Sequence, residues 1–252
     1  MTDTTPLKNR ILVTGTNSGL GKYIASQISC SVLTRDNSES VFKKSYDTII
    51  HCAFNSRKNV NDYYDIVRDN IFLTKDLCKI EHNKFVFISS IDVYQEEDNL
   101  YKISKLMSES IVKKMATSPL ILRCSAILGE TMRKNNFRKI IEDTDPDLSL
   151  SGESSFNYIL QEDILNFLNI ALKKNYNGIV DFVSSTNITL QEIADLLEKK
   201  VNFGSYVYKT PQISSENLTS VWPTAALTSK QNVKRYLKDC FRVDLESVLN
   251  EV

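Results

Sequence analysis

Short apolar runs alternate along the chain with longer segments in which apolar residues recur every three or four positions. The short runs predict buried strands near 10–14, 31–34, 47–51, 84–89, 119–123 and 178–183. The periodic segments predict helices near 19–29, 60–80, 99–117 and 161–174. Strands that alternate with helices form a parallel sheet with right-handed crossovers, and ligands bind beyond the carboxyl ends of its strands. The expected fold class is therefore α/β, with a Rossmann-like, doubly wound parallel sheet.

Composition is compatible with one sizeable α/β core and a small lobe. The chain has 252 residues, of which 42% are hydrophobic. Lys and Arg total 31 and Asp and Glu total 31, so no overall field attracts the protein to nucleic acid or to an acidic membrane. No apolar run approaches the ~20 residues of a membrane span, and residues 1–8 lack the apolar core of a signal peptide. We therefore expect a cytoplasmic protein without nucleic-acid or membrane partners.

Cysteine and histidine usage argues against a metal site. The five cysteines are scattered and include no C-x-x-C pair, which favours reduced thiols over disulfides or metal ligands. They are Cys30, Cys52, Cys78, Cys124 and Cys240. The chain has only two histidines, His51 and His82, so few residues could serve as zinc ligands or as the histidine of a Ser-His-Asp triad.

A glycine-rich segment joins the first strand to the first helix. Gly15, Gly19 and Gly21 follow the apolar run 11–13 and precede an amphipathic helical pattern. Glycines at such a turn let backbone amides approach a pyrophosphate, which the positive end of the helix also attracts. The plain alternative is an ordinary strand-to-helix turn. The position between a strand and a helix favours a dinucleotide site.

Tyr101 and Lys105 are four residues apart in a predicted helix and therefore share one of its faces. A phenol titrates near ~10 in water, and a neighbouring ammonium favours the phenolate and moves the pKa toward neutrality. Ser90 ends the apolar strand just upstream, where its hydroxyl can bond to the same substrate oxygen. The alternative is a solvated helix face with an ordinary tyrosine. Together with the glycine segment, the spacing favours an acid/base site.

Seven segments, in order from residue 10 to about 235, resemble those of a short-chain dehydrogenase/reductase. Within that superfamily the chain is similar to the extended branch, the NAD-dependent epimerase/dehydratase family that acts on nucleotide sugars, in an atypical and short form. Segment 14–21 resembles the cofactor loop, with its middle glycine displaced by one place. The other segments are 47–53, 70–77, 85–94, 122–129, 157–164 and 227–230.

The resemblance implies a single extended unit over 1–252. Its dinucleotide-binding core would comprise 8–124 and 161–183. The substrate lobe would comprise 125–160 and 184–252. By the same resemblance, a homodimer would pair through helices 60–80 and 99–117, where Ile71, Leu77, Leu106 and Ile111 are either interface or core residues.

The resemblance also implies roles for individual residues. Ser90, Tyr101 and Lys105 would be catalytic, with Lys105 also holding the nicotinamide ribose. Cofactor contacts would come from Gly15, Asn17, Ser18, Gly19, Leu20, Gly21, Arg35, Cys52, Ala53, Phe54, Asn70, Ser89, Tyr101, Lys105 and Cys124. Substrate contacts would come from Ser90, Asp92, Arg133 and Asn157. A solvated loop carboxylate is the alternative for Asp92, and a solvated face of a helix predicted over 131–143 is the alternative for Arg133.

Cofactor choice depends on the end of the second strand. An acidic residue there accepts hydrogen bonds from the ribose diol of NAD, whereas an arginine holds the 2′-phosphate of NADP. Arg35 precedes Asp36, and the family often places Thr-Arg at this point in NADP users. We therefore favour NADP(H) over NAD(H). A surface cation paired with Asp36 is the alternative.

The chain departs from the family pattern in places that bear on the reaction. Only about ten residues separate Arg35 from Asp47, the loop 95–99 is short, and Cys124 replaces the usual proline. Ile91 stands where the family's dehydratases carry an acid, and isoleucine cannot protonate a leaving hydroxyl.

With dehydration disfavoured, the reaction that the resemblance still implies is reversible hydride transfer at a sugar carbon. We expect NADPH-dependent reduction of a nucleotide-linked 4-keto-(6-deoxy) sugar, which by resemblance would serve cell-surface polysaccharide biosynthesis. One alternative is an NAD-dependent nucleotide-sugar 4-epimerase. An alternative of another class is a non-catalytic, dinucleotide-sensing protein, although such a protein would have no need of the Ser-Tyr-Lys set.

Overall fold

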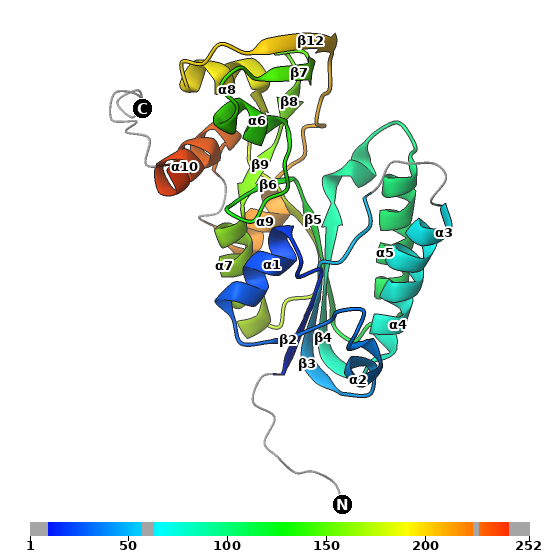
Figure 1. Ribbon diagram of the computed structural model, residues 1–252. Helices are drawn as coiled ribbons and strands as arrows, with labels where there is room; N and C mark the ends of the chain where they lie inside the picture. The colour runs from blue at the N-terminus through cyan, green and yellow to red at the C-terminus, as the bar shows by residue number, and fades with distance from the viewer. Residues whose placement is uncertain (1–9, 57–62, 224–226, 242–252) are drawn as a thin grey trace, which may run out of the picture. The chain divides into compact units, whose positions relative to one another are not determined.

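The computed structural model describes residues 10–56, 63–223 and 227–241 (Figure 1). The chain divides into two compact units. The first unit comprises 1–123 and 171–180, and the second comprises 124–170 and 181–252. The first unit contains nearly all of the residues for which the sequence predicts a role in catalysis or dinucleotide binding.

A six-stranded sheet has the strand order β10-β5-β4-β3-β1-β2. Its strands are β1 (Ile11–Thr14), β2 (Ser31–Val32), β3 (Tyr46–His51), β4 (His82–Ser90), β5 (Pro119–Cys124) and β10 (Gly178–Phe182). The pairs β1–β2, β1–β3 and β3–β4 are parallel. Because β2 and β3 lie on opposite sides of β1, the winding reverses beside β1, which is where open α/β sheets bind ligands. The predicted Rossmann-like, doubly wound sheet is confirmed.

Helices of the first unit cover both faces of this sheet. They are α1 (Gly19–Gln27), α2 (Ser38–Phe42), α3 (Tyr63–Ile66), α4 (Leu73–Lys79) and α5 (Leu100–Met115). Figure 1 shows α1 on one face and α4 and α5 on the other. Between α3 and α4 the chain forms a π-helical turn, Val67–Phe72. The helix predicted near 60–80 is thus confirmed over 63–79, and its first residues lie outside the described part of the chain.

Most of the apolar residues that the sequence left between core and interface belong to the core. Leu77 is fully buried and Ile71 nearly so, while Ile111 packs against the same apolar cluster as Leu77. Leu106 is exposed on α5. The strand predicted near 31–34 is shorter than expected. The Asn37 side chain accepts from the Thr34 amide and donates to the Val32 carbonyl, which turns the chain after Val32.

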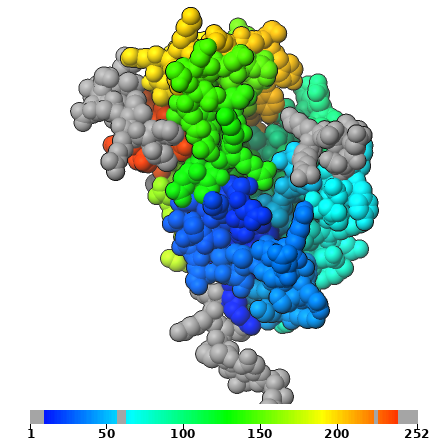
Figure 2. All heavy atoms as spheres, viewed as in Figure 1, coloured from blue at the N-terminus to red at the C-terminus, as the bar shows by residue number. Residues whose placement is uncertain are grey.

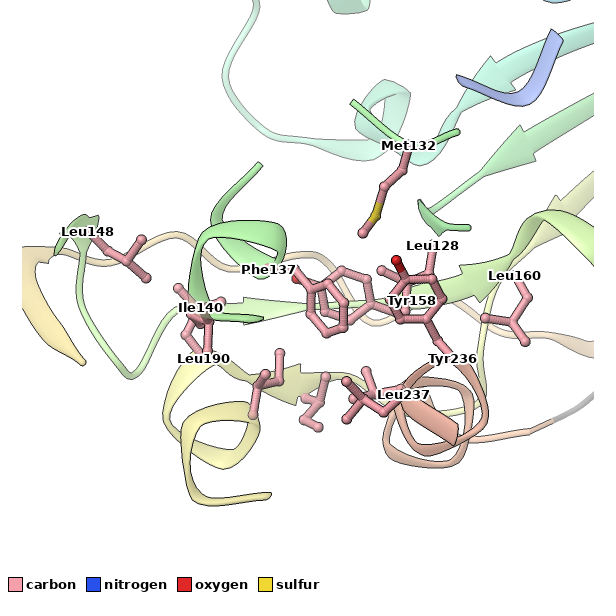
Figure 3. Packing of buried hydrophobic residues seen from close by; sticks show 13 residues of the cluster. Leu128, Met132, Phe137, Ile140, Leu148, Tyr158, Leu160, Leu190, Tyr236 and Leu237 are labelled. Carbon is pink, nitrogen blue, oxygen red and sulfur yellow. The ribbon is translucent and has the colours of Figure 1, made fainter. Parts of the chain in front are cut away.

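The second unit contains three two-stranded sheets, β11–β8, β12–β7 and β6–β9. Its strands are β6 (Ala126–Leu128), β7 (Asp147–Leu150), β8 (Ser155–Phe156), β9 (Tyr158–Leu160), β11 (Ile188–Thr189) and β12 (Asn202–Tyr206). Its helices are α6 (Asn136–Glu142), α7 (Gln161–Lys173), α8 (Leu190–Leu196), α9 (Glu216–Val221) and α10 (Ser229–Phe241); the last turn of α7 belongs to the first unit. Phe137, Tyr158 and Tyr236 lie at the centre of its core (Figure 3).

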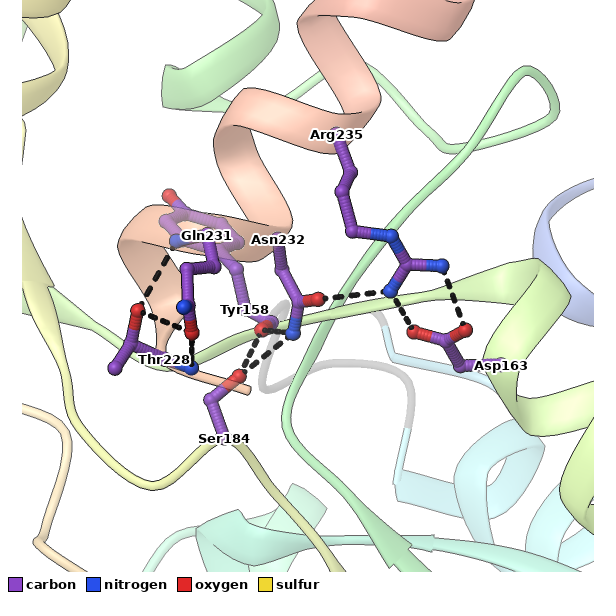
Figure 4. Close-up of polar contacts among 7 residues, drawn as sticks. All are labelled: Tyr158, Asp163, Ser184, Thr228, Gln231, Asn232 and Arg235. Carbon is purple, nitrogen blue, oxygen red and sulfur yellow. Dashed lines mark hydrogen bonds and ion pairs between the residues drawn. The ribbon is translucent and has the colours of Figure 1, made fainter. Parts of the chain in front are cut away.

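Polar contacts hold α10 against β9 and α7 (Figure 4). The Asn232 side chain donates to the Tyr158 carbonyl at 3.0 Å and to the Ser184 hydroxyl at 2.9 Å. The two terminal guanidinium nitrogens of Arg235, Nη1 and Nη2, donate to the Asp163 carboxylate, at 2.7 and 3.0 Å. A bidentate pair of this kind fixes direction as well as distance. These contacts of Asn232 and Arg235 hold α10 in place within the second unit.

The helix predicted over 131–143 begins later than expected. Asn135 accepts a hydrogen bond from the Arg138 amide, so it is the N-cap and α6 starts at Asn136. Arg133 consequently lies in the segment before the helix, and its prediction as a helical residue was wrong. In the described residues, we find no helix whose length and apolar character would suit a membrane crossing.

Candidate active site

The start of α5 determines which way the helix face that carries Tyr101 and Lys105 points. The Asn99 side chain accepts from the Lys102 amide at 2.9 Å, and Asn99 has an extended backbone, as an N-cap residue does. Lys102 in turn donates to the Gln95 carbonyl at 2.6 Å and pairs with Asp98 at 2.9 Å. The short loop and the helix start are therefore tied together just before Tyr101.

Tyr101 and Lys105 lie close together, as their spacing predicts. The Lys105 Nζ is 5.8 Å from the centre of the Tyr101 ring. The lysine is almost completely buried, and Nζ donates to the Ile88 carbonyl at 2.7 Å. A buried positive charge acts strongly on neighbouring groups because little water screens it. The arrangement therefore places a buried positive charge next to the Tyr101 phenol.

Ser90 ends β4 and is oriented by the turn that follows. Its hydroxyl oxygen accepts from the Asp92 amide at 3.1 Å. The hydroxyl hydrogen then points elsewhere, because the oxygen serves as the acceptor for that bond. Ser90 is two residues beyond Ile88, whose carbonyl binds Lys105, so the same strand end carries both groups. The serine can donate to an oxygen of a bound substrate.

A buried ion pair lies one helical turn beyond Lys105. Glu109 binds Arg123 of β5 through two hydrogen bonds, at 3.0 and 2.7 Å. The Ser89 hydroxyl also donates to Glu109, at 2.6 Å, and Arg123 donates to the Tyr94 hydroxyl. The carboxylate thus connects α5 to the ends of β4 and β5. This pair was not predicted from the sequence, although Glu109 continues the spacing of Tyr101 and Lys105.

The π-helical turn gives Asn70 two sets of contacts. Its side chain bonds to both backbone groups of Asn55, at 2.7 and 3.0 Å, and donates to Ser104 at 3.3 Å. Its carbonyl accepts from the hydroxyls of Thr74 and Ser108. A π-helical turn widens the hydrogen-bond ladder and frees a carbonyl for such partners. Asn70 therefore holds the segment after β3 to α5.

His51 belongs to a buried chain of hydrogen bonds that starts at the end of β1. Its Nδ1 is 2.8 Å from the Thr14 hydroxyl, and its Nε2 is 2.9 Å from the Thr74 hydroxyl. Because Thr74 gives its own hydrogen to the Asn70 carbonyl, Nε2 must donate and Nδ1 must accept. Burial, assisted by the charge of Lys105, lowers the pKa of His51 to about 3. His51 is therefore neutral and structural.

The glycine loop after β1 follows the geometry that the sequence predicts. Gly15 has φ +74°, and a Cβ there would lie 2.6 Å from the Ala53 nitrogen, so only glycine lets β1 and β3 approach at this point. Gly19, at the start of α1, has φ +62°, and a Cβ there would meet no atom within 4 Å. Open space thus lies at the amino end of α1. Asn17 and Ser18 flank it, and Leu20 is buried below.

The segment after β2 lies on the surface of the first unit, where Figure 2 shows it in blue. Arg35 and Asp36 are both exposed, and the Arg35 carbonyl accepts from Ser38. At the end of β3, burial raises the pKa of the Cys52 thiol to about 12, and the charge of Lys105 opposes this shift. Cys52 is therefore a thiol rather than a thiolate.

Three residues with predicted roles belong to the second unit. Cys124 is buried and Arg133 is exposed. Asn157 is buried, and its amide bonds to both backbone groups of Ser184 and to Asn187. These contacts give Asn157 a structural function that the sequence analysis did not foresee.

The described side chains include four of the five cysteines. Among them, Cys30, Cys52, Cys78 and Cys124 form no disulfide, while the Cys240 side chain lies outside this set. The described ranges likewise contain no group of three or more His, Cys, Asp or Glu residues placed to hold a metal ion.

A family model described as the NAD dependent epimerase/dehydratase family matches residues 12–179, well over half of the chain. The chain belongs to this family. Its members are NAD-dependent oxidoreductases, epimerases and dehydratases that act on nucleotide sugars. No curated protein sequence matches the chain significantly.

Solved structures with the same fold include members of this family. MoeE5, in complex with UDP-glucuronic acid and NAD, has a TM-score of 0.77 and 16% identity over 91% of this chain and 99% of its own. dTDP-4-dehydrorhamnose reductase from Bacillus anthracis, in complex with NADP, has a TM-score of 0.76 and 16% identity, with coverages of 93% and 99%. UDP-glucuronic acid 4-epimerase from Bacillus cereus, in complex with UDP-glucuronic acid and NAD, has a TM-score of 0.69 and 17% identity, with coverages of 91% and 99%. At these identities the likeness concerns the fold, and both NAD and NADP occur among these structures.

Proposed function

We propose that this member of the family reduces a nucleotide-linked 4-keto-(6-deoxy) sugar with NADPH. The observation that carries the proposal is the placement of Tyr101 and Lys105, with the ammonium 5.8 Å from the phenol ring and buried beside it. An acid that works near neutral pH needs such a charge to lower the phenol pKa. The Ile91 side chain, where a dehydratase needs an acid, favours reduction over dehydration.

The first unit fits a nicotinamide dinucleotide. Open space at Gly19 and the positive end of α1 suit a pyrophosphate, and the Gly15 turn lies at the point where the sheet winding reverses. Ala53 and Phe54, just beyond β3, would line its nicotinamide side, and Arg35 would bind a 2′-phosphate. When bound, the reduced dinucleotide supplies the hydride. Everything else in the reaction falls to side chains of the protein.

Proton donation, orientation of the substrate oxygen and stabilisation of the phenolate are carried out by different side chains. The Tyr101 hydroxyl gives its proton to the oxygen that the reduction turns into an alcohol. Ser90 donates a hydrogen bond to the same oxygen, which its bond from the Asp92 amide leaves it able to do. Lys105 stabilises the resulting phenolate. Asp92 and Arg133 would contact the sugar nucleotide, and a guanidinium suits its diphosphate.

Incubation with NADPH and a panel of dTDP-, GDP- and CDP-linked 4-keto-6-deoxyhexoses tests this proposal. We expect absorbance of the reduced nicotinamide to fall with one of these sugars and the corresponding alcohol to appear by mass spectrometry. Interconversion of 4-hydroxy sugars without net NADPH consumption would instead identify an epimerase. No reaction with any member of the panel would contradict the proposal.

The preference for NADPH gives a second test. Replacing Arg35 by alanine should weaken NADPH binding about tenfold or more, because the guanidinium bonds to the phosphate are lost, and should leave NADH binding unchanged. Fluorescence titration of both dinucleotides measures this ratio. Lys44→Ala removes a nearby exposed cation and serves as the control. An equal loss for both dinucleotides would contradict a role for Arg35 in phosphate binding.

A homodimer is part of the same proposal. Ile103, Leu106 and Met107 are exposed on α5, and Phe72 is exposed at the end of the π-helical turn. Apolar side chains grouped on one helix surface favour a protein partner, here a second copy of the chain. The substrate would be a small sugar nucleotide, reduced in the cytoplasm for cell-surface polysaccharide.

A further inference from the structure

The Lys105 ammonium is buried against the faces of aromatic rings. Its Nζ lies 3.6 Å from the centre of the Phe54 ring and 4.9 Å from that of the Phe87 ring. The residue is 3% exposed. Taking an ammonium out of water is costly, and a ring face within about 6 Å offsets part of that cost. The two rings and the Ile88 carbonyl all contact this charge.

Phe54 also contacts the phenol of the same site. Its ring meets the Tyr101 ring edge to face, with centroids 5.4 Å apart and planes at 85°. Phe87 fixes Phe54 from the sheet side, at 6.5 Å between ring centres. One aromatic side chain thus touches both the ammonium and the phenol. This geometry leaves the two reacting groups little freedom to move apart.

The other titratable groups around Lys105 do not replace the rings. His51 and Cys52, at the end of β3, both feel its charge. Burial keeps the imidazole and the thiol neutral, so neither neutralises the ammonium. Tyr101 faces it from α5, with its ring centre 5.8 Å from Nζ.

We propose that Phe54 is a positioning residue whose ring, together with that of Phe87, holds the Lys105 ammonium charged and in place beside Tyr101. Its effect on hydride transfer rests on the proposed function, whereas its hold on Lys105 does not. A leucine would fill similar space but has no negative face to attract a cation. The proposal can therefore be separated from simple burial.

Phenylalanine analogues with one, two or three ring fluorines at position 54 give the sharpest test. They keep the ring shape and progressively weaken its negative face. Trace labelling of the folded protein with acetic anhydride, followed by peptide mass spectrometry, measures the free-amine fraction of each lysine. We expect labelling of Lys105 to rise with each fluorine, to about five- to tenfold for three.

Lys84 is the internal control. It is nearly as buried as Lys105, and its ammonium donates to the Tyr176 carbonyl and the Asn177 side chain, which are oxygen acceptors. Its labelling should stay constant through the fluorine series. Phe54→Leu should label Lys105 like the trifluorinated protein, and Phe54→Tyr should label it like the wild type. Equal labelling of Lys105 in all fluorinated proteins would overturn the proposal, because the ring would then be a steric cover only.

Turnover separates this inference from the proposed function. If the protein reduces a 4-keto sugar, kcat should fall along the fluorine series while the KM for the sugar stays constant. Reduction of a sugar together with flat Lys105 labelling would overturn the role of Phe54 and leave the function standing. Labelling that follows the fluorines in a protein inactive on every sugar would support the hold on Lys105 and contradict the function.

Discussion

Replacing Tyr101 by phenylalanine is expected to lower turnover by about 100-fold or more and to leave NADPH affinity unchanged. In the proposed reaction the hydroxyl supplies the proton for the new alcohol, while the ring of the variant still packs against Phe54. NADPH oxidation with the best sugar of the panel measures turnover, and fluorescence titration measures the dissociation constant of NADPH. A loss confined to turnover would assign the hydroxyl to the chemical step.

The control for this variant is Tyr64→Phe, which removes a hydroxyl from an exposed residue of α3 and should change neither quantity. A Tyr101→Phe protein with full turnover would contradict the acid/base assignment. A protein that binds NADPH, reduces no sugar and responds to neither substitution would instead fit a dinucleotide sensor.

Replacing Glu109 by alanine is expected to lower the free energy of unfolding by about 3–5 kcal/mol. The Arg123 side chain is only 14% exposed, and the substitution removes its bidentate partner. It also removes the acceptor of the Ser89 hydroxyl. Urea denaturation followed by circular dichroism measures the change. The loss is large because a buried charge is left uncompensated.

An exposed ion pair provides the comparison. Glu39→Ala breaks the Lys43–Glu39 pair, whose side chains are largely exposed, and should cost no more than about 0.5 kcal/mol. The double variant Glu109→Leu with Arg123→Met should be more stable than Glu109→Ala, since it leaves no unpaired charge. If Glu109→Ala cost as little as Glu39→Ala, the pair would not connect α5 to β4 and β5 as we describe.

The sheet and the proximity of Tyr101 and Lys105 were predictable because each follows from residues that are close together in the sequence. Apolar runs mark buried strands, and a spacing of four places two side chains on one helix face. The start of α6 was mispredicted because capping by Asn135 outweighed the apolar period. The end of β2 was missed for a similar reason, as Asn37 reaches back to Val32.

The contacts around the site were not predictable from one sequence. Glu109 and Arg123, or Phe54 and Lys105, come from segments far apart in the chain, and only the folded sheet brings them together. The sequence also gives no signal for the π-helical turn at Asn70, because the apolar residues of this turn suit an α-helix equally well. Tertiary packing selects among such local options.

Because Asn99 caps α5, the relative position of Tyr101 and Lys105 does not depend on the length of the loop before the helix. Since the cap sets where α5 begins, Tyr101 and Lys105 keep their mutual geometry whatever number of residues leads up to Asn99. Changes in length between Tyr94 and Asn99 should therefore leave the Tyr101–Lys105 geometry unchanged. Under the proposed function, grafting longer loops at 95–99 is a practical route to altered sugar preference.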